Sequence, residues 1–258
     1  MDRDLVRQIT NVVAYGVTLV ANGLAVALPL NGNSTAELSD RFPVLVTPAN
    51  YVFSIWTVIY ILLGAFVVYQ ALPRMRTDTD FRAIGYLPVV AGALNTLWIV
   101  LWHFEVFAAT VPVMLALLGT LILIHVRLRS VRSDGGAKRW LLGLPFSVYL
   151  GWITVATIAN MSQMLYWAGF RGGPLSEDAW AVIVLAIGVI IAAVMLVREA
   201  DWAYALVIVW AYVGIAAKQT ATAAVLSAVI GAVVVVVLIA WVLYSPPPPA
   251  AGRRPASP

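Results

Sequence analysis

The most informative absences in this sequence are those of cysteine and of charge. None of the 258 residues is cysteine, and Asp, Glu, Lys and Arg together make up only 11% of the chain. Without cysteine the chain forms no disulfide and no thiolate metal site, and it has no cysteine nucleophile. The hydrophobic content of 62% exceeds what a soluble domain of this length can bury. We therefore expect an all-α fold, a polytopic membrane helical bundle.

The basic residues lack the clustering that is typical of nucleic-acid binding. The formal net charge is only +4, and the Lys and Arg residues lie in short loops between apolar runs, where they set the orientation of a membrane protein. Of the 16 Lys and Arg residues, all but Arg41, Arg171 and Lys218 fall on one side of the predicted topology. We predict an even number of spans with both termini cytoplasmic, in the cell (inner) membrane, and no nucleic-acid partner.

Apolar runs predict about eight transmembrane helices. The N-terminal residues lack the features of a signal peptide, so we expect the first run to be a retained span. The fifth run is long enough to bend at Pro145, and the seventh is short for a full crossing. The longest internal loop, residues 31–49, is of the kind that can act as a lid. The predicted spans are residues 8–30, 50–72, 84–103, 105–127, 139–168, 179–197, 202–217 and 221–244.

The second predicted helix has an ordered aromatic face. Trp56, Tyr60 and Gly64 follow one another at intervals of four residues, so they lie one above the other on a helix. Buried Trp and Tyr side chains usually find polar partners for their N–H and O–H groups. A helix that faces only lipid has no need of this order, so we interpret this helix as one wall of a pocket.

The third predicted helix carries Asn95, Trp98 and Trp102 on one face. An asparagine at membrane depth is unfavourable unless it is paired or faces a polar cavity. Asn95 is therefore either a pocket residue or the partner of a neighbouring helix. Trp102, near the end of the helix, is either a pocket residue or an anchor at the membrane interface.

The fifth predicted helix carries a second stripe of the same kind, formed by Tyr149, Trp152, Ala156 and Asn160. The small side chain of Ala156, between aromatic and amide groups, leaves room for a flat ligand. The alternative is that Ala156 only permits close packing of two helices.

Together these three stripes resemble the TspO/MBR family, which includes the tryptophan-rich sensory proteins and the mitochondrial translocator protein. The matching motifs are WTxxYxxxG, ALNxxW and YLxWxxxAxxxN, in the order and spans of the family, and the resemblance covers about residues 8–168. It implies an intramembrane pocket beneath the first loop that holds tetrapyrroles such as protoporphyrin or haem, sterols, and drug-like aromatic compounds. It implies ligand contacts from Trp56, Tyr60, Asn95, Trp152 and Ala156, to which the spacing adds Trp98, Tyr149 and Asn160 as ligand-binding candidates.

The resemblance divides the chain into three parts. Residues 1–175 are expected to form the five-helix unit of the family, residues 176–244 three additional transmembrane helices, and residues 245–258 a disordered, Pro-rich cytoplasmic tail. Ala223, Ser227 and Gly231, spaced by four residues, favour close helix packing. We therefore hypothesise that the additional helices cover the surface through which five-helix proteins dimerise. The sequence leaves undecided whether this chain forms a homodimer. The approach to the second helix, 42-FPVLVTPANYVF-53, departs from the family, which leaves the choice of ligand open.

Three residues outside the stripes, Lys218, His103 and Glu105, are candidates for a covalent or metal-binding role. Lys218 is expected to extend to the membrane boundary, with a Schiff-base lysine for a retinal-like chromophore as the alternative. His103 and Glu105 lie two residues apart, but no third ligand is in view, so no metal site is predicted.

The preferred function is an integral membrane sensor or regulator that binds a flat hydrophobic ligand, either tetrapyrrole-like or isoprenoid-like. The alternatives are a transporter of such a ligand and an enzyme that degrades porphyrin by photo-oxidation. Spans one to five contain no buried acid suited to proton coupling, and no nucleophile–base pair indicates ordinary hydrolysis. No catalytic residue and no obligatory cofactor are predicted; a porphyrin or haem is the possible bound group. The expected partners are the hydrophobic ligand and membrane lipid.

Overall fold

The computed structural model describes residues 2–28, 30–133 and 136–245, and this part of the chain is helical with short connections. Six helical segments are long and apolar enough to cross a membrane, and α5 and α10 are shorter apolar helices. Together they match the eight predicted spans and confirm an all-α membrane bundle. The eight are α1 (Arg3–Ala27), α3 (Ile55–Ala71), α5 (Leu87–His103), α6 (Phe107–Arg127), α8 (Leu144–Trp167), α9 (Glu177–Glu199), α10 (Trp202–Lys218) and α11 (Thr222–Tyr244). The short helices are η1 (Leu30–Gly32), α2 (Thr35–Asp40), η2 (Asn50–Ser54), η3 (Pro73–Met75), α4 (Thr79–Ile84), α7 (Arg129–Ser133) and η4 (Arg139–Gly143).

Helix α1 begins five residues before the predicted span. The Asp2 side chain caps it by accepting a hydrogen bond from the Asp4 backbone N–H. Two polar side chains at this end of the helix are buried and bonded to a distant segment: Arg7 donates to the Arg76 carbonyl at 2.6 Å, and Gln8 donates to the Gln70 carbonyl at 2.5 Å. These bonds to the end of α3 and the segment after it help the helix to begin in a polar stretch.

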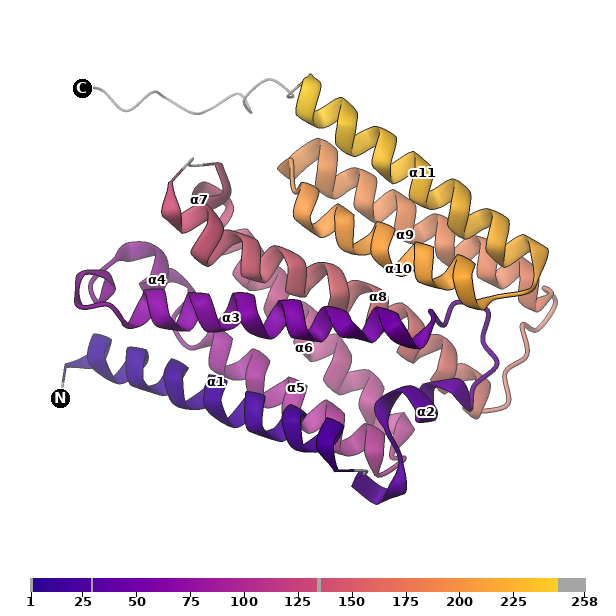
Figure 1. Cartoon of the computed structure of the whole chain (residues 1–258), viewed down its shortest axis with the longest axis horizontal. Coiled ribbons are helices and arrows are strands. Elements are labelled where there is room, and N and C mark those ends of the chain that lie inside the picture. Colours follow the sequence, from indigo (N-terminus) through magenta and orange to yellow (C-terminus); the bar gives the residue numbers. More distant parts are fainter. Residues whose placement is uncertain (1, 29, 134–135, 246–258) are drawn as a thin grey trace.

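Helix α8 is the central element of the bundle. In its most apolar window 72% of the residues are buried within the protein, against 22–33% for the other five long segments. It packs against α3 and α6 on one side and α10 on the other, while α9, α10 and α11 pack on one another (Figure 1). Its first turn, η4, is π-helical and leads directly into Pro145, where the predicted bend was placed.

The small residues of α11 serve contacts inside this chain. The buried positions are Ala224, Ala228 and Gly231, whereas Ala223 and Ser227 are only partly buried. A Cβ atom at Gly231 would lie 2.7 Å from the ring of Tyr212 on α10. The predicted close packing is therefore present, on a helix face shifted by one residue.

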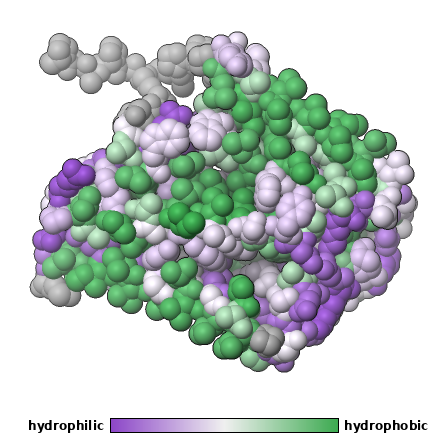
Figure 2. Space-filling model, viewed as in Figure 1, coloured by the Kyte–Doolittle hydropathy of each residue, from purple (hydrophilic) through white to green (hydrophobic). Residues whose placement is uncertain are grey.

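The two ends of the described chain lie at the same end of the bundle. In Figure 1 the start of α1 and the end of α11 lie on the side of α4 and α7, and α2 lies at the opposite end. Figure 2 shows hydrophobic surface across the middle of the molecule and hydrophilic residues gathered at the two ends. This is the surface of a multi-pass integral membrane protein with an even number of crossings. The predicted tail lies outside the described residues, except for Ser245.

Candidate functional site

Four of the predicted ligand residues form one aromatic cluster between α3 and α8. The ring centroid of Trp56 lies 5.5 Å from that of Tyr60, and the two rings are nearly parallel. It meets Tyr149 at 5.9 Å and Trp152 at 6.1 Å, both edge to face. These are favourable geometries for aromatic pairs. The spacing along two separate helices therefore identified side chains that meet in space.

Asn95 lies on α5 beside this cluster and is bonded to another helix. Its Oδ1 atom accepts a 2.7 Å hydrogen bond from Asn22 Nδ2 on α1, and both amides are buried. This is the interhelical pairing that was one of its two interpretations. Asn22 was not singled out in the sequence, although it is an amide in an apolar run and carried the same signal as Asn95.

Trp98 and Trp152 line one small cavity of about 40 Å³, together with Ala156 and Asn160. Trp98 is stacked on Trp102 at 5.4 Å, and the Trp102 indole donates to the Thr35 carbonyl. In contrast, the indole N–H groups of Trp98 and Trp152 are buried and have no hydrogen-bond partner among the described residues. Buried donors are normally paired, and these two unpaired donors belong to residues that line one cavity.

Asn160 lies at the edge of the same cavity. Its amide is paired with Thr110 on α6, accepting at 3.2 Å and donating at 3.0 Å. Ala156 is partly buried and borders the cavity, so its small side chain leaves space there.

Tyr60 and Tyr149 line a second cavity of about 30 Å³, toward α1. The space at Gly64, one turn beyond Tyr60, is occupied by the side chain of Tyr15, whose hydroxyl donates to the Tyr60 carbonyl at 2.9 Å. The single hollow expected from the three stripes is thus divided into two small cavities. We call the region that holds both the inner chamber.

Residues 31–49, the cover segment, close one end of the inner chamber. Ser39 and Thr35 of this segment line the 40 Å³ cavity. Gln163 on α8 donates to Ser39 Oγ at 2.8 Å, and His103 Nε2 lies 3.4 Å from the Thr35 hydroxyl. Gln163 is a buried carboxamide one turn beyond Asn160, and this spacing could have pointed to it.

Charged residues also fasten the cover segment. Arg41 pairs with Glu105 at 2.8 Å, and Lys218 at the end of α10 pairs with Asp40. Lys218 does lie at a helix end, as expected, but it is held by a carboxylate that local spacing did not reveal.

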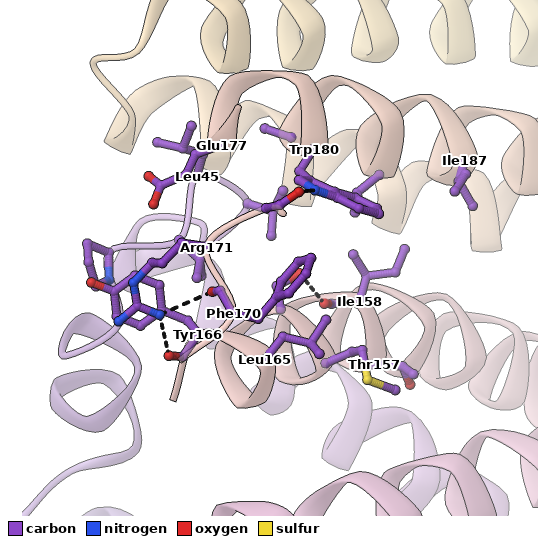
Figure 3. Close-up of a pocket in the computed structure, with 18 residues that line it drawn as sticks. Leu45, Thr157, Ile158, Leu165, Tyr166, Phe170, Arg171, Glu177, Trp180 and Ile187 are labelled. Atoms are coloured by element: carbon purple, nitrogen blue, oxygen red, sulfur yellow. Dashed lines mark hydrogen bonds between the residues drawn. The ribbon is translucent and has the colours of Figure 1, made fainter. Parts of the chain in front are cut away.

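A hollow larger than either cavity of the inner chamber lies elsewhere, between α8 and α9. This lateral groove has a volume of about 390 Å³, and its walls come from the cover segment, α8, the α8–α9 connection and α9 (Figure 3). Residue spacing did not predict this groove, because its lining comes from four separate segments that only the folded chain brings together. Its lining includes Leu45, Ile158, Met161, Leu165, Phe170, Arg171, Glu177, Trp180, Val184 and Ile187.

Comparison with known proteins gives one match. No curated protein and no solved structure is significantly similar to this chain. A family model described as TSPO-like protein matches residues 8–243, a range that reaches all eight apolar helices and omits only the first five residues of α1 and the last residue of α11. The match extends well beyond the residues 8–168 that the motifs covered, so α9, α10 and α11 are part of the family pattern. The chain belongs to the TSPO-like protein family.

Proposed function

We propose that this protein binds a flat, hydrophobic small molecule in the inner chamber and acts as a membrane sensor or regulator of that molecule. The observation that carries the proposal is the pair of unpartnered indole N–H groups, from Trp98 and Trp152, on one cavity. A ligand acceptor, such as a carbonyl or carboxylate oxygen or a ring nitrogen, would satisfy both donors. The aromatic faces of Trp56 and Tyr60 would stack on its ring system.

Binding of a ring system as large as a tetrapyrrole requires the inner chamber to open. Its two cavities, of about 30 and 40 Å³, hold little more than a water molecule or two each. The aromatic cluster that separates them consists of rings in mutual contact. A flat ligand would replace these ring–ring contacts by ring–ligand contacts, and the cover segment would move to admit it.

Metal-free protoporphyrin IX is the appropriate first probe. None of the described residues that line the two cavities is histidine, methionine or cysteine, and these side chains supply most axial ligands of haem iron. The stacking faces and the indole donors suit the ring itself. A retinoid serves as the isoprenoid-like comparison.

The test is a titration of the purified full chain with each probe, followed by probe absorbance and tryptophan quenching. We expect saturable binding that Trp98→Phe and Trp152→Phe each weaken by about three- to tenfold, because each loses one hydrogen bond. Trp241→Phe, on the exposed face of α11, is the matched control and should bind like the wild type. Unchanged affinity in a Trp98→Phe/Trp152→Phe double variant would contradict the proposal.

The same preparation separates binding from the other functions. Uptake of the probe into proteoliposomes would identify a transporter. Loss of probe absorbance that depends on light, oxygen and protein, and that disappears in Trp56→Phe, would identify a photo-oxidative enzyme. Binding with no change in the probe supports the sensor.

A further inference from the structure

The lateral groove combines an apolar body with a charged end. Figure 3 shows Arg171 and Glu177 at one end of the groove and Ile187 and Thr157 toward the other. Its lining is mostly apolar, and Leu165 and Ile187 are 39% and 47% exposed. Because these exposed apolar side chains lie on membrane-spanning helices, the groove opens to lipid. It is therefore accessible to a molecule that enters from the bilayer.

The guanidinium of Arg171 is held in place but is not neutralised. Its Nη1 atom donates to the carbonyls of Tyr166, at 2.6 Å, and Phe170, at 3.1 Å. Its Cζ atom lies 3.6 Å from the centroid of the Tyr166 ring. These contacts fix the side chain and leave Nε and Nη2 without a partner in the described ranges. No carboxylate of those ranges lies within ion-pair distance of Arg171.

Glu177 supplies the opposite charge on the same rim. It is the first residue of α9, and its carboxylate makes no ion pair with any described residue, Arg171 included. The rim is kept in shape by Trp180, whose indole donates to the Gly172 carbonyl at 2.7 Å and whose ring meets Phe170 edge to face. The groove thus presents a separate cation and anion above one apolar body.

We propose that the lateral groove is a binding site for an aminophospholipid, with the phosphate on Arg171, the primary ammonium on Glu177 and an acyl chain along α8 and α9. An anionic lipid without an ammonium would place its charge beside an unpaired carboxylate. A sterol would leave both charges without a partner. A zwitterionic headgroup offers a partner to each charge, and a primary ammonium, unlike a quaternary one, has N–H groups that can donate hydrogen bonds to the carboxylate.

The experiment is native mass spectrometry of the full chain released from detergent micelles. The protein is titrated with dioleoyl phosphatidylethanolamine, phosphatidylcholine and phosphatidylglycerol, and with cholesterol. We expect phosphatidylethanolamine to be retained preferentially. Arg171→Gln should lower its retention by about tenfold, and Glu177→Gln should lower the preference over phosphatidylglycerol by a similar factor. Arg74, an exposed residue of η3 between α3 and α4, lies outside the groove lining; Arg74→Gln is the control and should not change either value.

A groove-filling variant protects the test against misfolding. Val184→Trp keeps both charges and fills the apolar body, so it should lower retention of all three phospholipids while the melting temperature stays within the range of the control. The proposal is overturned if phosphatidylcholine, phosphatidylglycerol or cholesterol is retained as well as phosphatidylethanolamine. It is also overturned if Arg171→Gln and Val184→Trp fold and retain lipid like the wild type. Probe binding in the inner chamber is a separate measurement, so failure of one proposal does not decide the other.

Discussion

At the scale of single residues, Ala156 controls the free space beside the Trp152 indole. We predict that Ala156→Leu weakens probe binding by about tenfold, because three extra carbons enter a cavity of about 40 Å³. The affinity is measured by the same absorbance titration. Ala116→Leu, on an exposed position of α6, adds the same atoms outside the inner chamber and should leave the affinity unchanged. Equal affinities for the two variants would show that the ligand does not use this cavity.

Residue spacing predicted the aromatic cluster and could not predict its polar partners. Trp56 and Tyr60 were placed on one face because the helical repeat fixes which side chains align, and the contact of Trp56 with Trp152 confirms that the two predicted faces meet. The Asn22–Asn95 pair joins positions 73 residues apart. Such a pairing depends on the rotation of two helices about their axes, which no local pattern specifies.

At the scale of elements, the cover segment depends on the Asp40–Lys218 ion pair. We predict that Asp40→Asn increases the rate of limited proteolysis within residues 31–49, because the segment loses its charged link to α10. Arg74→Gln, at the other end of the bundle, should be cleaved like the wild type. A proteolysis rate unchanged by Asp40→Asn would show that the remaining contacts hold the segment alone.

The same ion pair gives the cover segment a dependence on acid. Burial raises the pKa of the Asp40 carboxyl. The hydrogen bonds from Lys218 and Asn50, together with the charge of Lys218, lower this pKa by more than burial raises it, so the pKa lies below its usual value. A lowered folded-state pKa means that the stabilisation is complete at neutral pH and is lost as pH falls through that pKa. The wild type should therefore become more susceptible to an acid-active protease only below about pH 4, and Asp40→Asn should lack this change.

Close approach of α8 and α10 depends on Gly151. A Cβ atom there would lie 3.0 Å from the Tyr204 carbonyl oxygen and 3.1 Å from Val207 Cβ. We predict that Gly151→Ala lowers the free energy of unfolding by about 1–3 kcal/mol, seen as a lower melting temperature in detergent. A Cβ atom at Gly119, on α6, would meet nothing within 4 Å among the described residues apart from the adjacent part of its own helix, so Gly119→Ala should melt no lower than the wild type. Equal melting of both variants would mean that the two helices adjust freely.

Element boundaries were predicted well where an apolar run stops at helix-breaking residues and less well where a polar run is buried. The end of α11 at Tyr244, just before a run of prolines, coincides with the end of its predicted span. The start of α1 was missed because the carbonyl groups that accept from Arg7 and Gln8 lie 69 and 62 residues further along the chain. The lateral groove could not be predicted, because its size depends on how far apart α8 and α9 lie in the folded chain, and no local pattern specifies that distance.

At the scale of the whole molecule, the distribution of basic residues predicts the orientation in the membrane. The natural absence of cysteine makes single-cysteine variants specific reporters. We predict that Arg74→Cys reacts with a membrane-impermeant maleimide only in inside-out vesicles, and Asn33→Cys only in right-side-out vesicles. Arg74 lies in the connection to α4 and Asn33 in the connection to α2, and these two helices lie at opposite ends of the bundle. The reverse labelling pattern would place both termini outside the cell.

Helix α8 borders both hollows: Trp152 and Ala156 line the inner chamber, and Ile158 and Met161, within two turns of them, line the lateral groove. A rotation or shift of α8 that changes the inner chamber therefore also changes the lateral groove. If the two proposals hold, binding at one site changes the affinity at the other. Thermodynamic reciprocity then requires that the lipid changes the affinity for the aromatic compound by the same factor as the compound changes the affinity for the lipid. The protein would then report the concentration of one molecule relative to the composition of the membrane around it.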